Sequence, residues 1–155
     1  MLFVVFYLET LQLSGNPITA ILAKDLKKLA KLQNLRLDNC QLVEIEKGSF
    51  NHLTNLQYLN LTSNDLRHVP APLHSTELIQ LDMKNNPWKC NCNMLEVYIF
   101  LRQNPRITVS EFSCSAPAKL KERPVLTLTK KEICKHSTTG GKKNKNKNKS
   151  KIDNE

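Results

Sequence analysis

Cysteines are the residues of this 155-residue chain whose spacing most clearly indicates chemistry. Four of the five, Cys90, Cys92, Cys114 and Cys134, form an even set in the C-terminal half, which predicts disulfide bonds in an oxidising compartment. A zinc site is the alternative, but one residue separates Cys90 from Cys92, whereas zinc sites usually space their first two cysteines by two to four. The disulfide interpretation is favoured, and the sequence alone leaves three pairings open.

The sequence shows no combination of residues suited to catalysis. Its histidines, at His52, His68, His74 and His136, are scattered and have no neighbouring nucleophile or metal-binding partner at helical spacing. There is also no glycine-rich phosphate loop and no carboxylate pair at a recognisable spacing. We therefore expect no enzyme activity, no cofactor and no metal ion.

Repeats are the elements that must position the cysteines. Copies of one leucine pattern align on Leu11, Leu35, Leu59 and Leu81, at steps of 24, 24 and 22 residues. A fixed period of this size predicts a solenoid, in which each repeat buries its apolar face against its neighbours. A helix or a coiled coil would need leucine spacings that do not occur here.

The pattern LxxLxLxxNxL fits residues 56–66 at every position, and the chain therefore resembles the leucine-rich repeat family. The resemblance implies an α/β solenoid with about four short parallel strands on its concave face, expected at 11–13, 35–37, 59–61 and 81–83. The turns that leave these strands carry Asn16, Cys40, Asn64 and Asn86. An asparagine amide there can bond to the backbone of adjacent turns, and Cys40 is expected to be a buried free thiol. A reactive or intermolecular Cys40 is the alternative.

The segment NPWKCNC (86–92), followed by Cys114 and Cys134, resembles the C-terminal cap of extracellular leucine-rich repeat proteins. The resemblance implies the pairs Cys90–Cys114 and Cys92–Cys134. An amphipathic helix is expected at 93–103, where it would cover the apolar edge of the last repeat together with Trp88. The predicted organisation is N-terminally incomplete repeats at 1–85, the cap at 86–134 and a disordered lysine-rich tail at 135–155.

Polar side chains that alternate with the strand leucines are expected to point outward from the concave face. The candidates for protein binding are Gln12, Arg36, Asp38, Tyr58, Asn60, Gln80, Asp82 and Lys84. The alternative is that these are ordinary solvated strand residues. Asn60 also begins the glycosylation sequon Asn-Leu-Thr, and a glycan there would block part of the face.

The net charge of +9 is unevenly distributed, because six lysines crowd into residues 142–151. The simplest interpretation is a solvated tail without a binding role. The more specific one is electrostatic attraction of the tail to a glycosaminoglycan or a nucleic acid. The absence of interleaved aromatic residues argues against nucleic acid. The lysines concerned are Lys142, Lys143, Lys145, Lys147, Lys149 and Lys151.

The apolar start, MLFVVFY (1–7), has no basic region and no cleavage site typical of a signal peptide. We expect that the chain begins inside a longer solenoid, and no segment is apolar over the roughly 20 residues of a membrane span. The predicted function is therefore a non-enzymatic, extracellular or secreted module for protein–protein interaction. One alternative is a C-terminal fragment of a cell-surface receptor ectodomain. The other is a protein that binds polyanions through its lysine-rich tail.

Overall fold

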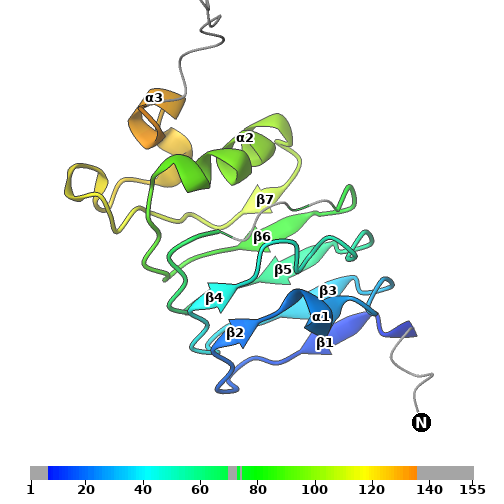
Figure 1. The fold of residues 1–155 in the computed structure, drawn as a ribbon. Coiled ribbons are helices and arrows are strands. Elements are labelled where there is room, and N and C mark those ends of the chain that lie inside the picture. The colour runs from blue at the N-terminus through cyan, green and yellow to red at the C-terminus, as the bar shows by residue number, and fades with distance from the viewer. Residues whose placement is uncertain (1–6, 70–72, 74, 136–155) are drawn as a thin grey trace, which may run out of the picture.

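The computed structural model describes residues 7–69, 73 and 75–135. Its main feature is a parallel five-stranded sheet in the order β1 (Thr10–Gln12), β3 (Asn34–Arg36), β5 (Tyr58–Asn60), β6 (Gln80–Asp82) and β7 (Thr108–Val109) (Figure 1). The repeat leucines pair in register, Leu11 with Leu35, Leu35 with Leu59 and Leu59 with Leu81. The leucine-rich repeat solenoid expected from the resemblance is therefore present.

The strands differ from the expectation in position and number. Each begins and ends one residue earlier than predicted, although the hydrogen-bonded ladder continues, since Leu13, Leu37 and Leu61 donate to the next strand at 2.9, 2.9 and 2.8 Å. Strand boundaries depend on where pairing stops, so a shift of one residue does not change the faces of the sheet. The expectation of about four strands missed β7, which comes from the C-terminal region and pairs with β6.

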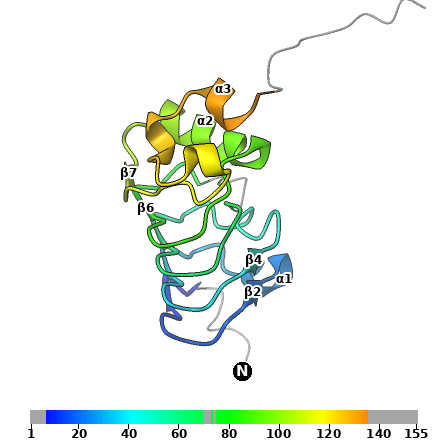
Figure 2. The ribbon, with the colours of Figure 1, turned by 90° about the vertical axis from the view of Figure 1, so that its left-hand side faces the viewer.

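The opposite side of the solenoid carries smaller elements. Strands β2 (Ala20–Ile21) and β4 (Glu44–Ile45) form a two-stranded parallel sheet, next to the short helix α1 (Ala23–Leu26). Figure 2 shows these elements on one side of the coil and β6 and β7 on the other. The sequence also predicts that Pro70 and Pro72 break regular structure on this side in the third repeat, but both lie outside the described residues.

Leucines stacked in layers form the core. Leu35, Leu59 and Leu81 are fully buried at the centres of their strands, whereas their strand neighbours remain at least partly exposed. Burying a leucine side chain contributes roughly 1.5–3 kcal/mol, so the period of the sequence specifies the stack. Phe50 and Leu26, each three residues before a leucine of the repeat pattern, are predicted from the sequence to pack on the convex side, and both are buried.

The buried amide of Asn64 joins consecutive turns. Its Oδ1 accepts the N–H groups of Cys40 (2.9 Å) and Leu42 (3.0 Å) in the preceding repeat, and its Nδ2 donates to the carbonyls of Leu37 (2.8 Å) and Leu61 (2.9 Å). Asn86 repeats this arrangement one turn later, where it accepts from Leu66 and donates to Leu61. Each amide therefore satisfies backbone groups that would otherwise be buried without a partner.

The other two turn positions make fewer bonds. Asn16 is exposed, and its Nδ2 donates to Leu13 and Ser14 within its own turn. Cys40 is buried and free, and its Sγ donates to the carbonyls of Leu13 (3.1 Å) and Asp38 (3.4 Å). The N–H of Ile18, one repeat earlier, bonds instead to the backbone carbonyls of Asn16 and Cys40.

The C-terminal region packs on the last repeat through short helices: η2 (Cys92–Met94), α2 (Leu95–Gln103), η3 (Ala118–Leu120), η4 (Val125–Thr127) and α3 (Lys130–Ile133). The helix expected at 93–103 is therefore divided into a 3₁₀ turn and an α-helix. Trp88 is fully buried, donates from Nε1 to the carbonyl of Met83 (2.8 Å) and contacts Phe112 edge-on at 6.3 Å. The repeat sheet continues into this region through β7, and the division at residue 86 stays a prediction.

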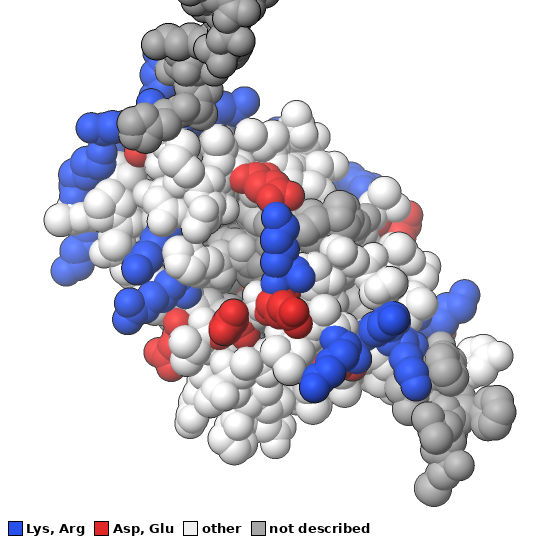
Figure 3. All heavy atoms as spheres, viewed as in Figure 1, with Lys and Arg blue, Asp and Glu red and all other residues white. Residues whose placement is uncertain are grey.

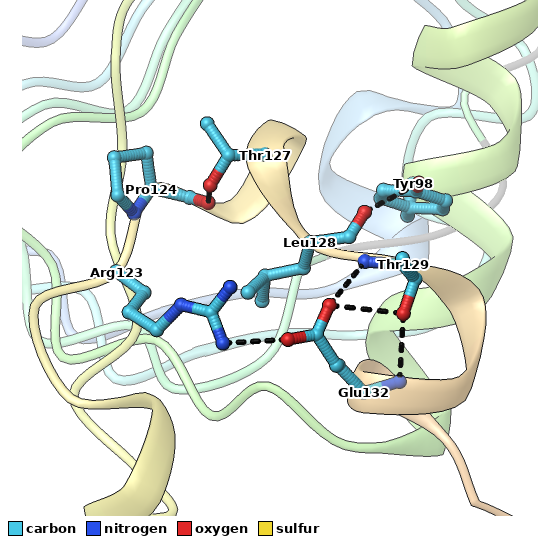
Figure 4. Close-up of polar contacts among 7 residues, drawn as sticks. All are labelled: Tyr98, Arg123, Pro124, Thr127, Leu128, Thr129 and Glu132. Carbon is cyan, nitrogen blue, oxygen red and sulfur yellow. Dashed lines mark hydrogen bonds and ion pairs between the residues drawn. The ribbon is translucent and has the colours of Figure 1, made fainter.

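Two disulfide bonds, Cys90–Cys114 and Cys92–Cys134, crosslink this region. They are the two pairs that the resemblance implied. Near the second bond, Tyr98 donates from its hydroxyl to the carbonyl of Leu128 (2.7 Å), which ties α2 to the segment before α3 (Figure 4). The side chains of Thr129 and Glu132 cap the first turn of α3.

Candidate binding face

The strands β1, β3, β5 and β6 present the candidate binding residues in two registered rows. One row contains Tyr58, with Asn34 and Gln80 beside it, and the next contains Asn60, between Arg36 and Asp82. The leucine between the rows is buried on the other face of the sheet, as the alternation of a strand requires. All eight candidates from the sequence are exposed or half-buried in the described structure.

At the centre of this surface three side chains from successive strands interact. The guanidinium carbon of Arg36 lies 5.3 Å from the centre of the Tyr58 ring, and the Tyr58 hydroxyl donates to Asp82 Oδ2 (3.0 Å). The same oxygen accepts Gln80 Nε2 (2.9 Å). We call Arg36, Tyr58 and Asp82 the central triad.

The environment of Tyr58 keeps its hydroxyl protonated. Burial raises the pKa of Tyr58 above its ordinary value of 10.0, as do the hydrogen bond to Asp82 and the negative charge of that residue. The positive charge of Arg36 and a hydrogen bond from Asn60 oppose the increase. Tyr58 is therefore a hydrogen-bond donor over the whole physiological pH range, and its hydroxyl bonds to Asp82.

A second cluster, of two hydrogen-bonded side chains, lies beyond the ends of the strands. Ser14 donates from Oγ to Asp38 Oδ1 (2.7 Å), which links the first two repeats on the same side as the central triad. Gln12 and Lys84, near the two ends of the surface, are exposed. The structure therefore places the predicted residues on one surface, but it joins them as two small clusters and not as a continuous network.

Asn60 lies in the middle of this surface and is half-buried. Its Oδ1 accepts the N–H of Thr62 (3.0 Å), the hydroxyl-bearing residue of the sequon. A glycan on Asn60 would stand between Arg36 and Asp82, its neighbours in the same row, so glycosylation and protein binding would compete for the same area.

Sequence reasoning missed the part of the face that β7 contributes. Thr108, in β7, pairs in register with Gln80 and is exposed, and Ser110 accepts the N–H of Met83 through its Oγ (2.8 Å). The β-branched run Ile107-Thr108-Val109 after Pro105 was the available signal. It was overlooked because a strand of two residues is defined by its partner more than by its own sequence.

The described residues contain no group of three His, Cys, Asp or Glu side chains arranged to hold a metal ion. Over the same residues, no helix has the length and apolar character of a membrane span. The lysines of segment 142–151, with His74 and His136, lie outside the described part of the chain, and attraction of that tail to a polyanion stays a prediction.

Comparison with family models gives two matches to the leucine rich repeat, at residues 7–29 and 30–87. Leucine-rich repeat-containing protein 3 of Danio rerio is 34% identical over 122 residues, which cover 77% of this chain and 46% of the relative. The phospholipase A2 inhibitor of Gloydius brevicaudus siniticus is 32% identical over 107 residues, covering 67% of this chain and 32% of the inhibitor.

Among solved structures, human trophoblast glycoprotein (5T4) aligns with a TM-score of 0.65 and 28% identity. The alignment covers 81% of this chain and 47% of that protein. The chain therefore spans less than half the length of each of these relatives.

Proposed function

Because the chain belongs to the leucine-rich repeat proteins and ends its repeats in a disulfide-bonded cap, we propose that it is a non-enzymatic module that binds another protein on its concave sheet. The observation that carries this proposal is the central triad, in which Arg36 contacts the Tyr58 ring and Tyr58 bonds to Asp82 at the middle of a broad polar surface. Tyrosine and arginine are enriched among the residues that dominate protein–protein binding energy. A side chain that is fixed before binding loses little conformational entropy when the partner arrives.

Three further observations support an extracellular protein partner. The disulfide bonds are typical of a protein in an oxidising compartment. A similar protein, trophoblast glycoprotein, is named as a glycoprotein. The phospholipase A2 inhibitor is named for its action on an enzyme, which is itself a protein. Secretion and binding at the concave face are part of our proposal, and so are the partners of the whole protein.

The proposal is tested with the purified chain against an array of secreted proteins and receptor ectodomains. Once a partner is found, the double variant Arg36→Ala/Tyr58→Ala should weaken its binding at least about tenfold, because hot-spot truncations typically cost 2 kcal/mol or more. Tyr58→Phe removes only the hydroxyl that bonds to Asp82 and should have a smaller effect.

The matched control is Lys24→Ala/Lys27→Ala, which truncates two exposed side chains of α1 and its C-terminal cap on the opposite side of the solenoid (Figure 2). It should leave the affinity unchanged. If this control weakens binding and the central-triad variant does not, the partner uses the other side and the proposal is wrong. Mass spectrometry of the peptide that contains Asn60, from the same secreted preparation, shows whether this residue carries a glycan.

A further inference from the structure

The net positive charge of the described chain is confined to its C-terminal part. Residues 1–85 contain eight basic and eight acidic side chains, whereas residues 86–135, which we call the cap segment, contain nine basic and four acidic ones. The excess of five positive charges in the cap segment is independent of the lysine run at 142–151. An electrostatic attraction of the folded protein for an anion must therefore act mainly at the cap segment.

Three of these basic residues surround one cavity. Lys89, Lys119 and Lys135 line a pocket of about 330 Å³, and its apolar lining includes Ala116, Pro117 and Ile133. This volume lies near the lower end of the roughly 300–1,000 Å³ typical of ligand pockets. We call it the lysine cavity.

The disulfide framework brings the three lysines together from distant parts of the sequence. Lys89 and Lys135 are each adjacent to a bonded cysteine, Cys90 and Cys134. Lys119 lies in η3, whose preceding residues are joined to the same region because Cys90 donates its N–H to the carbonyl of Ala116 (2.8 Å). The crosslinks therefore bring three positive charges from distant parts of the sequence to the lining of one cavity.

A single carboxylate lines the cavity, and it already has a cationic partner. Glu132 Oε1 lies 2.6 Å from Arg123 Nη1, and its Oε2 accepts the N–H and the hydroxyl of Thr129 (Figure 4). No ion pair joins Lys89, Lys119 or Lys135 to a carboxylate within the described residues. The three ammonium groups are therefore available to a ligand.

The surrounding surface extends the positive charge. Figure 3 shows lysine and arginine side chains along the left-hand edge of the cap segment, over η3 and α3, with little acidic surface between them. Lys121, Lys130 and Lys131 belong to these two parts of the chain and are exposed. A ligand that follows this edge meets more positive charge on leaving the cavity, which suits an extended anion better than a small one.

We propose that the lysine cavity and this edge bind a sulfated glycosaminoglycan. Lysine ammonium groups pair with sulfate groups as point charges, and the apolar lining gives the faces of a sugar ring a surface to contact. No Phe, Tyr or Trp is among the residues that line the cavity, so it offers no platform for stacking the bases of a single-stranded nucleic acid. The disulfides place the site in an oxidising compartment, outside the cytosol and nucleus. This surface is separate from the concave face, and the lysine run 142–151 is not required for it.

The test measures binding of the full chain to heparin at several salt concentrations, with three variants. Lys89→Gln/Lys119→Gln/Lys135→Gln should weaken binding roughly tenfold or more and flatten the dependence of affinity on salt, because fewer counterions are released. Lys89→Arg/Lys119→Arg/Lys135→Arg keeps the charges and should retain affinity. The matched control Lys24→Gln/Lys27→Gln/Lys31→Gln removes three exposed charges from the repeats and should have little effect.

Deleting residues 142–151 distinguishes the contribution of the lysine cavity to heparin binding from that of the lysine-rich tail. We expect the deleted protein still to bind heparin and still to lose affinity when the cavity lysines are replaced by glutamine. Loss of all binding on deletion would overturn the proposal, as would an equal loss in the repeat control or no binding by the intact chain. Desulfated heparin should bind much more weakly, and tighter binding to duplex DNA than to heparin would show that the ligand class is wrong. Unchanged far-ultraviolet circular dichroism and intact disulfides exclude misfolding of each variant.

Discussion

The repeats and the cap segment bury apolar surface in different ways. In the repeats, Leu35, Leu59 and Leu81 occupy equivalent places in successive layers, and Asn64 and Asn86 make equivalent bonds one turn apart. The cap segment has no such internal repetition within its described residues. It is held by two disulfides, one buried tryptophan and hydrogen bonds between short helices.

This difference has an energetic consequence. Each repeat gains stability from identical neighbours, so the loss of one contact leaves the others in place. The cap segment has no identical neighbours to stack against, and its two crosslinks add stability by limiting the conformational freedom of the unfolded chain. The two regions also differ in net charge, since the repeats are neutral and the cap segment is basic.

The largest effect is expected from breaking the longer crosslink. Cys92→Ala/Cys134→Ala opens a loop spanning 42 positions and should lower the free energy of unfolding by about 4 kcal/mol, as measured by urea denaturation. The loss should fall on the cap segment, where hydrogen exchange should speed up while the amides of β3 and β5 remain protected. Uniform acceleration over both regions would mean that the repeats depend on the crosslink as much as the cap segment does.

A smaller effect is expected from the turn of the third repeat. Asn64→Ala leaves two buried N–H groups and two buried carbonyls without their side-chain partner, and should cost about 3 kcal/mol in the same urea experiment.

Two equivalent positions serve as controls for Asn64. Asn16→Ala removes the same residue type from an exposed turn and should change stability by less than about 0.5 kcal/mol. Cys40→Ala removes weak bonds to two carbonyls and should cost about 1 kcal/mol. Equal losses for Asn64 and Asn16 would show that burial of the amide does not determine its contribution.

The smallest effect concerns the acid stability of the cap segment. Hydrogen bonds from the Thr129 backbone, Arg123 and the Thr129 side chain lower the pKa of Glu132 from 4.5 to about 2. Because the pKa is lower in the folded state, this stabilisation is complete above about pH 4.5 and is lost as the pH falls towards 2. Glu132→Gln should therefore lower the melting temperature at pH 7, and its difference from the wild type should shrink between pH 5 and pH 2. A constant difference over that range would contradict this assignment.

The repeats were predictable from the sequence because the leucine pattern that specifies them is short and recurs several times along the chain. The leucine spacing specified which side chains are buried, and the common step of 24 residues specified the pairing of Leu11, Leu35 and Leu59. That register also places Tyr58 diagonally between Arg36 and Asp82, although only the structure shows that the three side chains interact.

The cap segment was less predictable because its contacts join residues that are distant in the sequence. The spacing of the cysteines left three pairings open, and the correct pairs came from the family resemblance. Strand β7 has two residues and exists because the edge of β6 is available to it. The lysine cavity combines residues 89, 119 and 135, and no periodicity in the sequence relates them.

The chain contains one tryptophan, Trp88, which belongs to the cap segment and lies fully buried where that segment meets the last repeat. Because its indole N–H is bonded to Met83 and its ring contacts Phe112, it touches both regions at once. Its fluorescence is therefore an intrinsic optical signal for the joint between them. Emission from a dry, packed indole lies at shorter wavelength than emission from a hydrated one, so separation of the cap segment from the repeats can be followed in real time without attaching a dye.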